Sequence, residues 1–121
     1  MPAQTLTLLR PRFGIEHHAC SAPQLPTGDW WAMSRTPEGV TVLAELAEDG
    51  DAEPWRAFYN NDAHDLDQPG MLAAIVQPLA AAGLSVFAAS TYQADLVLVA
   101  AGSVDQAVKT LEAAGHTIVS L

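Results

Sequence analysis

The sequence predicts an α+β fold in which a shortened, β-rich half precedes a complete ferredoxin-like βαββαβ unit. Half of the 121 residues are hydrophobic and only 16% are charged, a composition that suits the core of one compact domain. After residue 53 strand and helix patterns alternate, whereas only strand-like runs precede it. An acidic segment broken by Gly50 and Pro54 separates these parts. We therefore expect two units, residues 1–52 and 53–121.

Four strand-like runs are predicted in the first part, at residues 5–9, 13–18, 30–34 and 40–46. The last two should form a hairpin, because the tetrapeptide Thr36-Pro37-Glu38-Gly39 has proline second and glycine fourth, as in a type I turn. Trp30 and Trp31 would face opposite sides of their strand. We expect one of them in the core and the other at an interface.

The second part begins with a strand predicted at residues 55–61, where polar and apolar side chains alternate. After a polar loop, Asp67 can cap a helix that starts at residues 68–70, and Gly83 should end it in a left-handed conformation. Pro78 lies inside this helix, so a bend is expected near Ala74 or Ile75.

Two buried strands, a helix and a last strand are predicted in the remainder. The strands cover residues 84–89 and 96–99 and are joined by a polar turn. Ser103 and Gln106 have the spacing of a capping box at the start of the helix, which Gly115 closes. A strand at residues 116–121 completes the order strand, helix, strand, strand, helix, strand of the ferredoxin-like arrangement.

Charge and cysteine content exclude several classes of function. The net charge of −9 disfavours binding to nucleic acid or to an anionic membrane, because both carry negative charge. Cys20 is the sole cysteine, so no disulfide within the chain is expected. Residues 1–4 lack a basic leader region, and no apolar run reaches membrane-spanning length. We expect a cytoplasmic protein.

The run Ser90-Thr91-Tyr92-Gln93-Ala94-Asp95-Leu96-Val97-Leu98-Val99 resembles the S-T-[YF]-x-x-D-x-x-L-V signature of ACT domains in the CASTOR arginine sensors and their small bacterial relatives. Residues 69–72 and 78–87 resemble the helix and following strand of these proteins, residues 34–41 their S-x-T-x-x-E/D hairpin, and residues 5–13 their opening strand. Residues 20–28 and 47–53 match weakly. The resemblance implies a shortened ACT-like half before a full ACT unit, and a homodimer, because the family's sites form where two ACT units meet side by side.

The resemblance also implies a binding site for a free amino acid, shared between two subunits. Ser85 and the backbone of Val86 from one subunit would meet the ligand carboxylate, and Asp95 of the other would meet the ligand ammonium. The turn Thr91-Tyr92 would line the ligand side chain. The residues implied in full are Asp95, Ser85, Val86, Thr91, Tyr92, Gln68 and Gly70.

The chemistry of these residues favours the same interpretation. A zwitterion that leaves water needs an anionic partner for its ammonium and several donors for its carboxylate. Gly70, at a helix start, allows a ligand to approach backbone amides and the positive end of the helix dipole. Gln68 stands where the arginine sensors have an acidic residue, so the sequence favours a ligand other than arginine. No group here performs bond-making chemistry, and we expect a regulatory protein without catalytic residues or cofactor.

Other readings remain open at this stage. Asp95 could cap a turn, and the scaffold could be a dimerisation module that docks on an unknown protein target and has a vestigial pocket. A third reading is a small metal-dependent enzyme that uses the region around His64. Possible metal ligands are His17, His18 and Cys20, or Asp62, His64, Asp65 and Asp67. Their spacing fits no standard motif, and we predict no metal site.

Overall fold

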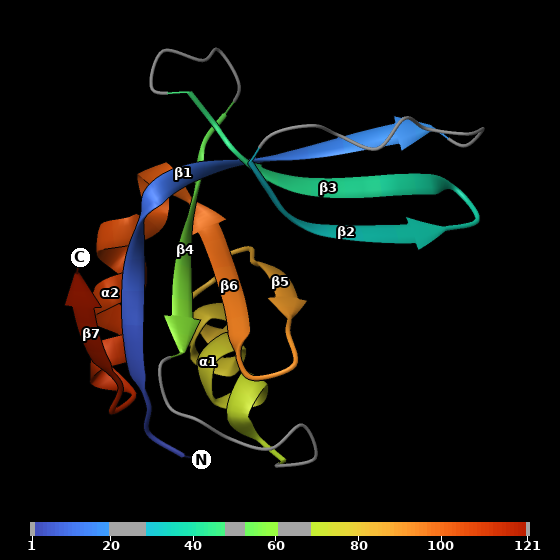
Figure 1. The fold of residues 1–121 in the computed structure, drawn as a ribbon. Coiled ribbons are helices and arrows are strands. Elements are labelled where there is room, and N and C mark those ends of the chain that lie inside the picture. The colour runs from blue at the N-terminus through green and yellow to red at the C-terminus, as the bar shows by residue number, and fades with distance from the viewer. Residues whose placement is uncertain (1, 20–28, 48–52, 61–68, 121) are drawn as a thin grey trace.

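The computed structural model describes residues 2–19, 29–47, 53–60 and 69–120 (Figure 1). The strands are β1 (Thr5–Ala19), β2 (Trp30–Thr36), β3 (Gly39–Glu45), β4 (Trp55–Asn60), β5 (Phe87–Ser90), β6 (Asp95–Ala100) and β7 (Thr117–Ser120). The helices are α1 (Met71–Ala81) and α2 (Val104–Ala113), and a 3-10 turn, Ala101–Ser103, leads into α2. The α+β class is therefore confirmed. In these parts of the chain no helix is long and apolar enough to cross a membrane.

The strands join one sheet whose order departs from the ferredoxin-like arrangement. The order is β2-β3-β1-β4-β6-β5, and β7 pairs in parallel with β1. In a ferredoxin-like unit the last strand would pair with β4, the first strand of the unit. Here β1 occupies that place, since it is antiparallel to β4 on one side and parallel to β7 on the other. The predicted order of elements is correct and the predicted sheet is not. The boundary between units 1–52 and 53–121 stays a prediction, although one sheet includes strands from both.

Strand β1 is one bent strand where the sequence predicts two. Its first part pairs with β4 and β7, and its second part pairs with β3. The register with β4 shifts between Leu8 and Arg12, and Figure 1 shows β1 turning between its two parts. Pro11 lies in this bulge, where its missing N–H leaves no ladder hydrogen bond unmade. The predicted β2–β3 hairpin is confirmed, with Thr36 opposite Gly39.

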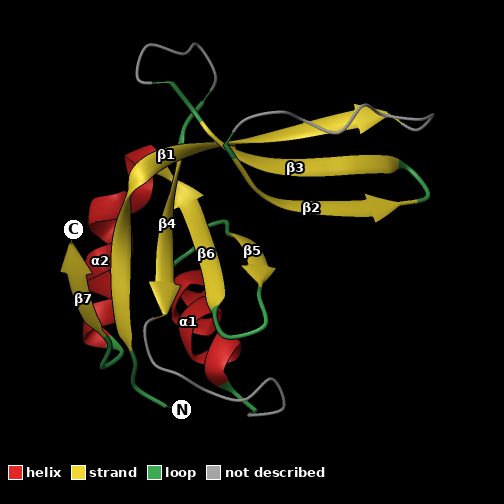
Figure 2. Ribbon diagram, viewed as in Figure 1, coloured by secondary structure: helices red, strands yellow, loops and turns green. Residues whose placement is uncertain are grey.

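Two hydrophobic clusters cover the two faces of the sheet around β4 and β6. On the helix side, Phe58, Val97 and Val99 pack with residues of α1 and α2, which Figure 2 shows behind the strands. On the other side, Leu96 and Leu98 pack with residues of β1 and β3. Because both faces of β6 are covered, its sequence is apolar from Leu96 to Ala100, as in other doubly covered strands.

Both helices end as the glycines predict. Gly83 and Gly115 have φ angles of 80° and 102°. After α1, the Leu84 N–H donates to the Leu79 carbonyl at 3.0 Å, and after α2 the same bond joins residues 116 and 111 at 3.0 Å. This is the Schellman arrangement, in which a left-handed glycine lets the chain satisfy the last carbonyls.

The predicted start of α1 is wrong, and the start of α2 is correct in position but lacks the predicted capping hydrogen bond. Helix α1 begins at Met71, and Gly70 caps it with a left-handed φ of 84° and no side-chain hydrogen bond. Pro69 therefore precedes the helix, while Asp67 and Gln68 lie outside the described residues. Ser103 occupies the N-cap of α2 but makes no capping hydrogen bond, because the 3-10 turn runs directly into the helix.

Two predictions of burial also fail. The strand predicted at residues 84–89 is shorter, β5, and lies at the end of the strand order with its face alternately half-buried and exposed. Trp30 and Trp31 are 43% and 41% exposed, so neither is a core residue. A bulge between Trp30 and Ala32 breaks the strict alternation on which that prediction depended.

Candidate functional site

Strand β5 separates the predicted ligand contacts into two groups. Thr91 and Tyr92 lie in the turn after β5, and Asp95 opens β6 opposite Ser90. Ser85 and Val86 precede β5 at its other end and are exposed. The five residue steps from Ser85 to Ser90 span roughly 16 Å if extended. One chain therefore does not bring Ser85 to Asp95.

Asp95 is a buried carboxylate whose side-chain partners include Ser90 and Asn60. It is only 6% exposed. The Ser90 hydroxyl donates to Oδ1 at 2.7 Å, and the Asn60 amide donates to Oδ2 at 3.2 Å. The Asp95 N–H in turn donates to Asn60 Oδ1 at 2.8 Å. Asn60 thus fixes both the backbone and the side chain of Asp95, which satisfies the charge where water is largely excluded.

A chain of hydrogen bonds continues from Asn60 to helix α1. The Asn60 amide also donates to Gln4 Oε1 at 3.0 Å, and Gln4 Nε2 donates to the Met71 carbonyl in the first turn of α1 at 2.8 Å. Gly70, the cap of α1, is adjacent to this contact. The start of α1 and the turn after β5 are therefore held at the same end of the sheet, as Figure 1 also shows.

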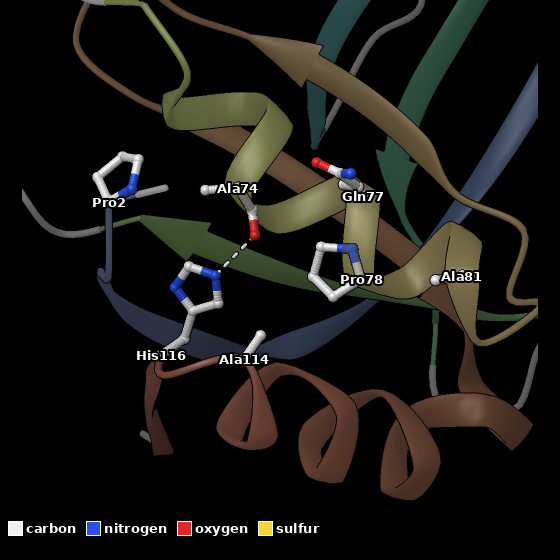
Figure 3. Close-up of a pocket in the computed structure, with 7 residues that line it drawn as sticks. All are labelled: Pro2, Ala74, Gln77, Pro78, Ala81, Ala114 and His116. Atoms are coloured by element: carbon white, nitrogen blue, oxygen red, sulfur yellow. Dashed lines mark hydrogen bonds between the residues drawn. The ribbon is translucent and has the colours of Figure 1, made fainter.

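His116 completes this network beside α1. Its Nδ1 accepts the Gln4 N–H at 3.1 Å, which leaves Nε2 as the donor to the Ala74 carbonyl at 2.7 Å (Figure 3). That carbonyl is available because Pro78, four residues later, has no N–H to offer it. Gln4, Asn60 and His116 were not predicted from the sequence, since their partners lie 35 or more residues away.

Thr91, one of the predicted ligand contacts, has a structural role in the turn after β5. The Thr91 hydroxyl donates to the Ala94 carbonyl at 3.0 Å and accepts the Ala94 N–H at 2.9 Å. Its backbone N–H also donates to the Ala94 carbonyl, at 2.7 Å. Tyr92, at the tip, is 79% exposed. Thr91 therefore shapes the turn, and Tyr92 is the side chain that the turn presents to solvent.

A cavity of about 430 Å³ lies between the two helices (Figure 3), and none of the predicted residues lines it. Its lining residues are Pro2, Ala74, Gln77, Pro78, Ala81, Ala114 and His116. Both ring nitrogens of His116 are already bonded, and the other side chains apart from Gln77 are apolar. The cavity has no charged group that could recognise a zwitterion.

The residues considered as metal ligands fall into two sets. Cys20 and the loop containing Asp62, His64, Asp65 and Asp67 lie outside the described residues. His17 and His18 are exposed near the end of β1, and His18 Nε2 lies 3.4 Å from a Glu16 carboxylate oxygen. Within the described ranges, no three His, Cys, Asp or Glu side chains are grouped to hold a metal ion.

Comparison with known protein families identifies the unit that contains β5. The ACT-domain family model matches residues 52–113, more than half of the chain, from just before β4 to the end of α2. The chain belongs to the ACT-domain family. ACT domains generally bind amino acids in regulatory roles. The family match does not distinguish the arginine-sensor type from other ACT proteins, so that finer assignment stays a prediction.

Solved structures with the same fold cover the N-terminal strands as well. Protein Atu0741 from Agobacterium tumefaciens has a TM-score of 0.84 and 22% sequence identity, covering 100% of this chain and 96% of its own. Protein VC0802 from Vibrio cholerae, described as of unknown function and a possible transport protein, has a TM-score of 0.67 and 20% identity, covering 88% and 85%. These likenesses establish the fold alone. No curated protein sequence matches the chain.

Proposed function

We propose that this ACT protein is a non-catalytic regulator that binds a free amino acid between two copies of the chain. The observation that supports the proposal is the open edge of β5, which pairs only with β6 among the described strands. The predicted contacts for the ligand carboxylate lie at one end of this edge, and those for its ammonium lie at the other. A second copy is the simplest way to bring the two groups together.

Strand pairing across a two-fold axis gives the required geometry. If β5 pairs antiparallel with β5 of a second copy around Ala88, residue 85 of one chain lies opposite residue 91 of the other. Ser85 and Val86 would then face the turn that leads to Asp95. Val86 and Tyr92, 36% and 79% exposed in the single chain, would both be covered in such a dimer.

Asp95 is the anionic anchor in this proposal. Its contacts with Ser90 and Asn60 hold this carboxylate at the start of β6, beside the turn that follows β5. In a low-dielectric site it would attract an ammonium group strongly. The ligand carboxylate would find the backbone donors and hydroxyl at Ser85 and Val86. With Gln68 in place of an acidic residue, a neutral ligand side chain is favoured over the guanidinium of arginine.

A second candidate function is a dimerisation module with a vestigial pocket. The observation in its favour is that Asp95 is 6% exposed and already bonded to two side chains. In this alternative the Ser90–Asp95–Asn60 contacts only stabilise the fold, and β5 pairs with another copy without any ligand. The two candidates differ in whether a ligand changes the dimer.

A screen of the common amino acids by thermal unfolding tests the proposal first. A ligand present at 100 times its Kd stabilises the native state by about 2.7 kcal/mol, which is readily measured as a higher Tm. Sedimentation at the same concentrations reports whether the dimer is strengthened. The dimerisation module predicts an unchanged Tm and a ligand-independent dimer.

Mixing two inactive variants tests whether the site is shared. Ser85→Asp places a negative charge against the ligand carboxylate on an exposed loop, and Asp95→Asn removes the partner of the ammonium. Each variant alone should lose binding. When they are mixed, each mixed dimer holds one site with both native residues, so about a quarter of the sites should recover. Absence of recovery, with both variants folded and dimeric, would refute a site built from two subunits.

A further inference from the structure

A polar cavity lies at the bend of β1, away from the residues of the proposed amino-acid site. Its volume is about 570 Å³, and its lining consists of Arg10, Pro11, Arg12, Glu45, Leu46 and Arg56. Three of the five lysine and arginine residues in the whole chain therefore line one cavity. In a protein with a net charge of −9, such a concentration of cations is unusual.

The bulge in β1 explains how these arginines meet. Three residues of β1 lie between Leu8 and Arg12, while a single residue of β4 lies between their partners Phe58 and Arg56. The extra residues turn β1 and leave Arg10 beside the pair formed by Arg12 and Arg56. Arg12 and Arg56 are direct cross-strand partners. This pairing places two guanidinium-bearing residues opposite each other on neighbouring strands.

Arg56 has no anionic partner in the parts of the chain that the structure describes. Its Nη2 donates to the Leu9 carbonyl at 2.9 Å, and its buried Nε has no hydrogen-bond partner. Glu45, the carboxylate in the lining, accepts a hydrogen bond from Trp31 Nε1 at 2.8 Å and does not pair with Arg56. Arg10 and Arg12 take part in further interactions, so the inference rests on Arg56. Arg56 as a whole is partly buried, but a buried N–H such as its Nε–H is costly to leave without an acceptor.

We propose that this cavity binds a small oxyanion with two or more negative charges, a phosphate group or the carboxylates of a polycarboxylic acid. The guanidinium of Arg56 offers a planar fork of donors that matches two oxygens of either group. The lining remains net positive after Glu45 is counted. The overall negative charge opposes binding only weakly, because charges beyond about 8 Å are screened at physiological salt.

The test titrates the full chain with inorganic phosphate and, separately, with citrate at constant ionic strength. Binding is followed by calorimetry and by the NMR signal of the Arg56 Nε–H. We expect saturable binding of one probe in the millimolar range or tighter, and Arg56→Gln should weaken it about tenfold or more. Arg35→Gln and Lys109→Gln remove the same charge outside the cavity and should change affinity by no more than about twofold.

Several results would overturn the proposal. One is the absence of saturable binding of both probes up to roughly 10 mM. Another is an equal loss of affinity in Arg56→Gln and Arg35→Gln, which would mean that only the overall charge matters. If Arg56→Gln does not fold, the wild-type NMR titration decides. A saturable shift of the Arg56 Nε–H supports the site, and a static signal refutes it. The probe that saturates identifies the ligand class.

Discussion

Replacing His116 by alanine tests the buried network through its longest-range contact. The substitution removes the acceptor of the Gln4 N–H and the donor to the Ala74 carbonyl, at 3.1 and 2.7 Å. Each buried main-chain group left without a partner costs about 1–3 kcal/mol. The neighbouring cavity of about 430 Å³ can admit water that restores part of this loss. Two such groups would together cost about 2–6 kcal/mol. Because water can offset part of this cost, we expect His116→Ala to lower the stability by about 2–4 kcal/mol.

The carbonyl of Ala74 allows a sharper test through Pro78. Pro78→Ala supplies the N–H that an uninterrupted helix would donate to this carbonyl. In that background the bond from His116 is partly redundant, so His116→Ala should cost about 1 kcal/mol less than in the native sequence. This coupling is independent of any effect of Pro78→Ala itself on the unfolded chain.

Urea unfolding of the native chain, the two single variants and the double variant measures the cycle. His17→Ala, an exposed histidine on β1, is the matched control and should change stability by less than about 0.5 kcal/mol. Thermal melting should report the same order, with Tm lowered by roughly 10 °C for His116→Ala. A loss below about 1 kcal/mol for His116→Ala, or additive effects of the two substitutions, would refute the role assigned to the ring.

Three further substitutions test other parts of the structure by the same unfolding assay. Asn60→Ala removes the partner of the buried Asp95 carboxylate and should cost roughly 2–4 kcal/mol, whereas an effect no larger than that of the exposed Gln93→Ala would contradict the network. Gly83→Ala has open space around the new Cβ but a φ of +80°, so it should cost about 1 kcal/mol, while Gly102→Ala, also in open space, should be near neutral. Equal costs for the two glycines would show that the left-handed φ is not the cause. Phe13→Ala empties a fully buried position on β1, in the hydrophobic cluster that also contains Leu96 and Leu98, and should cost about 3–5 kcal/mol; a loss under 1 kcal/mol would mean that this cluster contributes little.

The local signals in the second half of the chain could be read from the sequence because their causes are local. Gly83 and Gly115 adopt the left-handed conformation that ends a helix, and this requirement does not depend on distant residues. The apolar run of β6 indicates a strand covered on both faces, which the structure confirms. The S-T-Y-x-x-D run led to the ACT family, and the family match includes it.

The starts of the helices show where local signals mislead. Ser103 and Gln106 have capping-box spacing, but the preceding 3-10 turn replaces the expected geometry and Ser103 makes no side-chain cap. At α1 the conformation of Gly70, and not a capping side chain, begins the helix. Several residue types suit a helix start, so the pattern alone does not select among them.

The candidate site was predicted only in part. Asp95 was expected as a ligand contact on the strength of a resemblance, and its assigned role stays a prediction. What could not be foreseen is that Asn60, Gln4 and His116 connect Asp95 to the helix. A polar residue near the end of a strand carries no sign of its partner, because the partner is chosen when distant strands and helices pack together.

The sequence by itself determined the order of strands and helices in the ACT unit and the residues at which both helices end, since backbone preference and hydrophobic period act over a few neighbouring residues. Only the tertiary structure decided that β1 bends at Pro11 and lies between β4 and β7. That pairing joins segments about 50 and 110 residues apart, and any strand with a suitable apolar face could compete for the same edge. The bulge that accompanies this pairing also brought three arginines to one cavity.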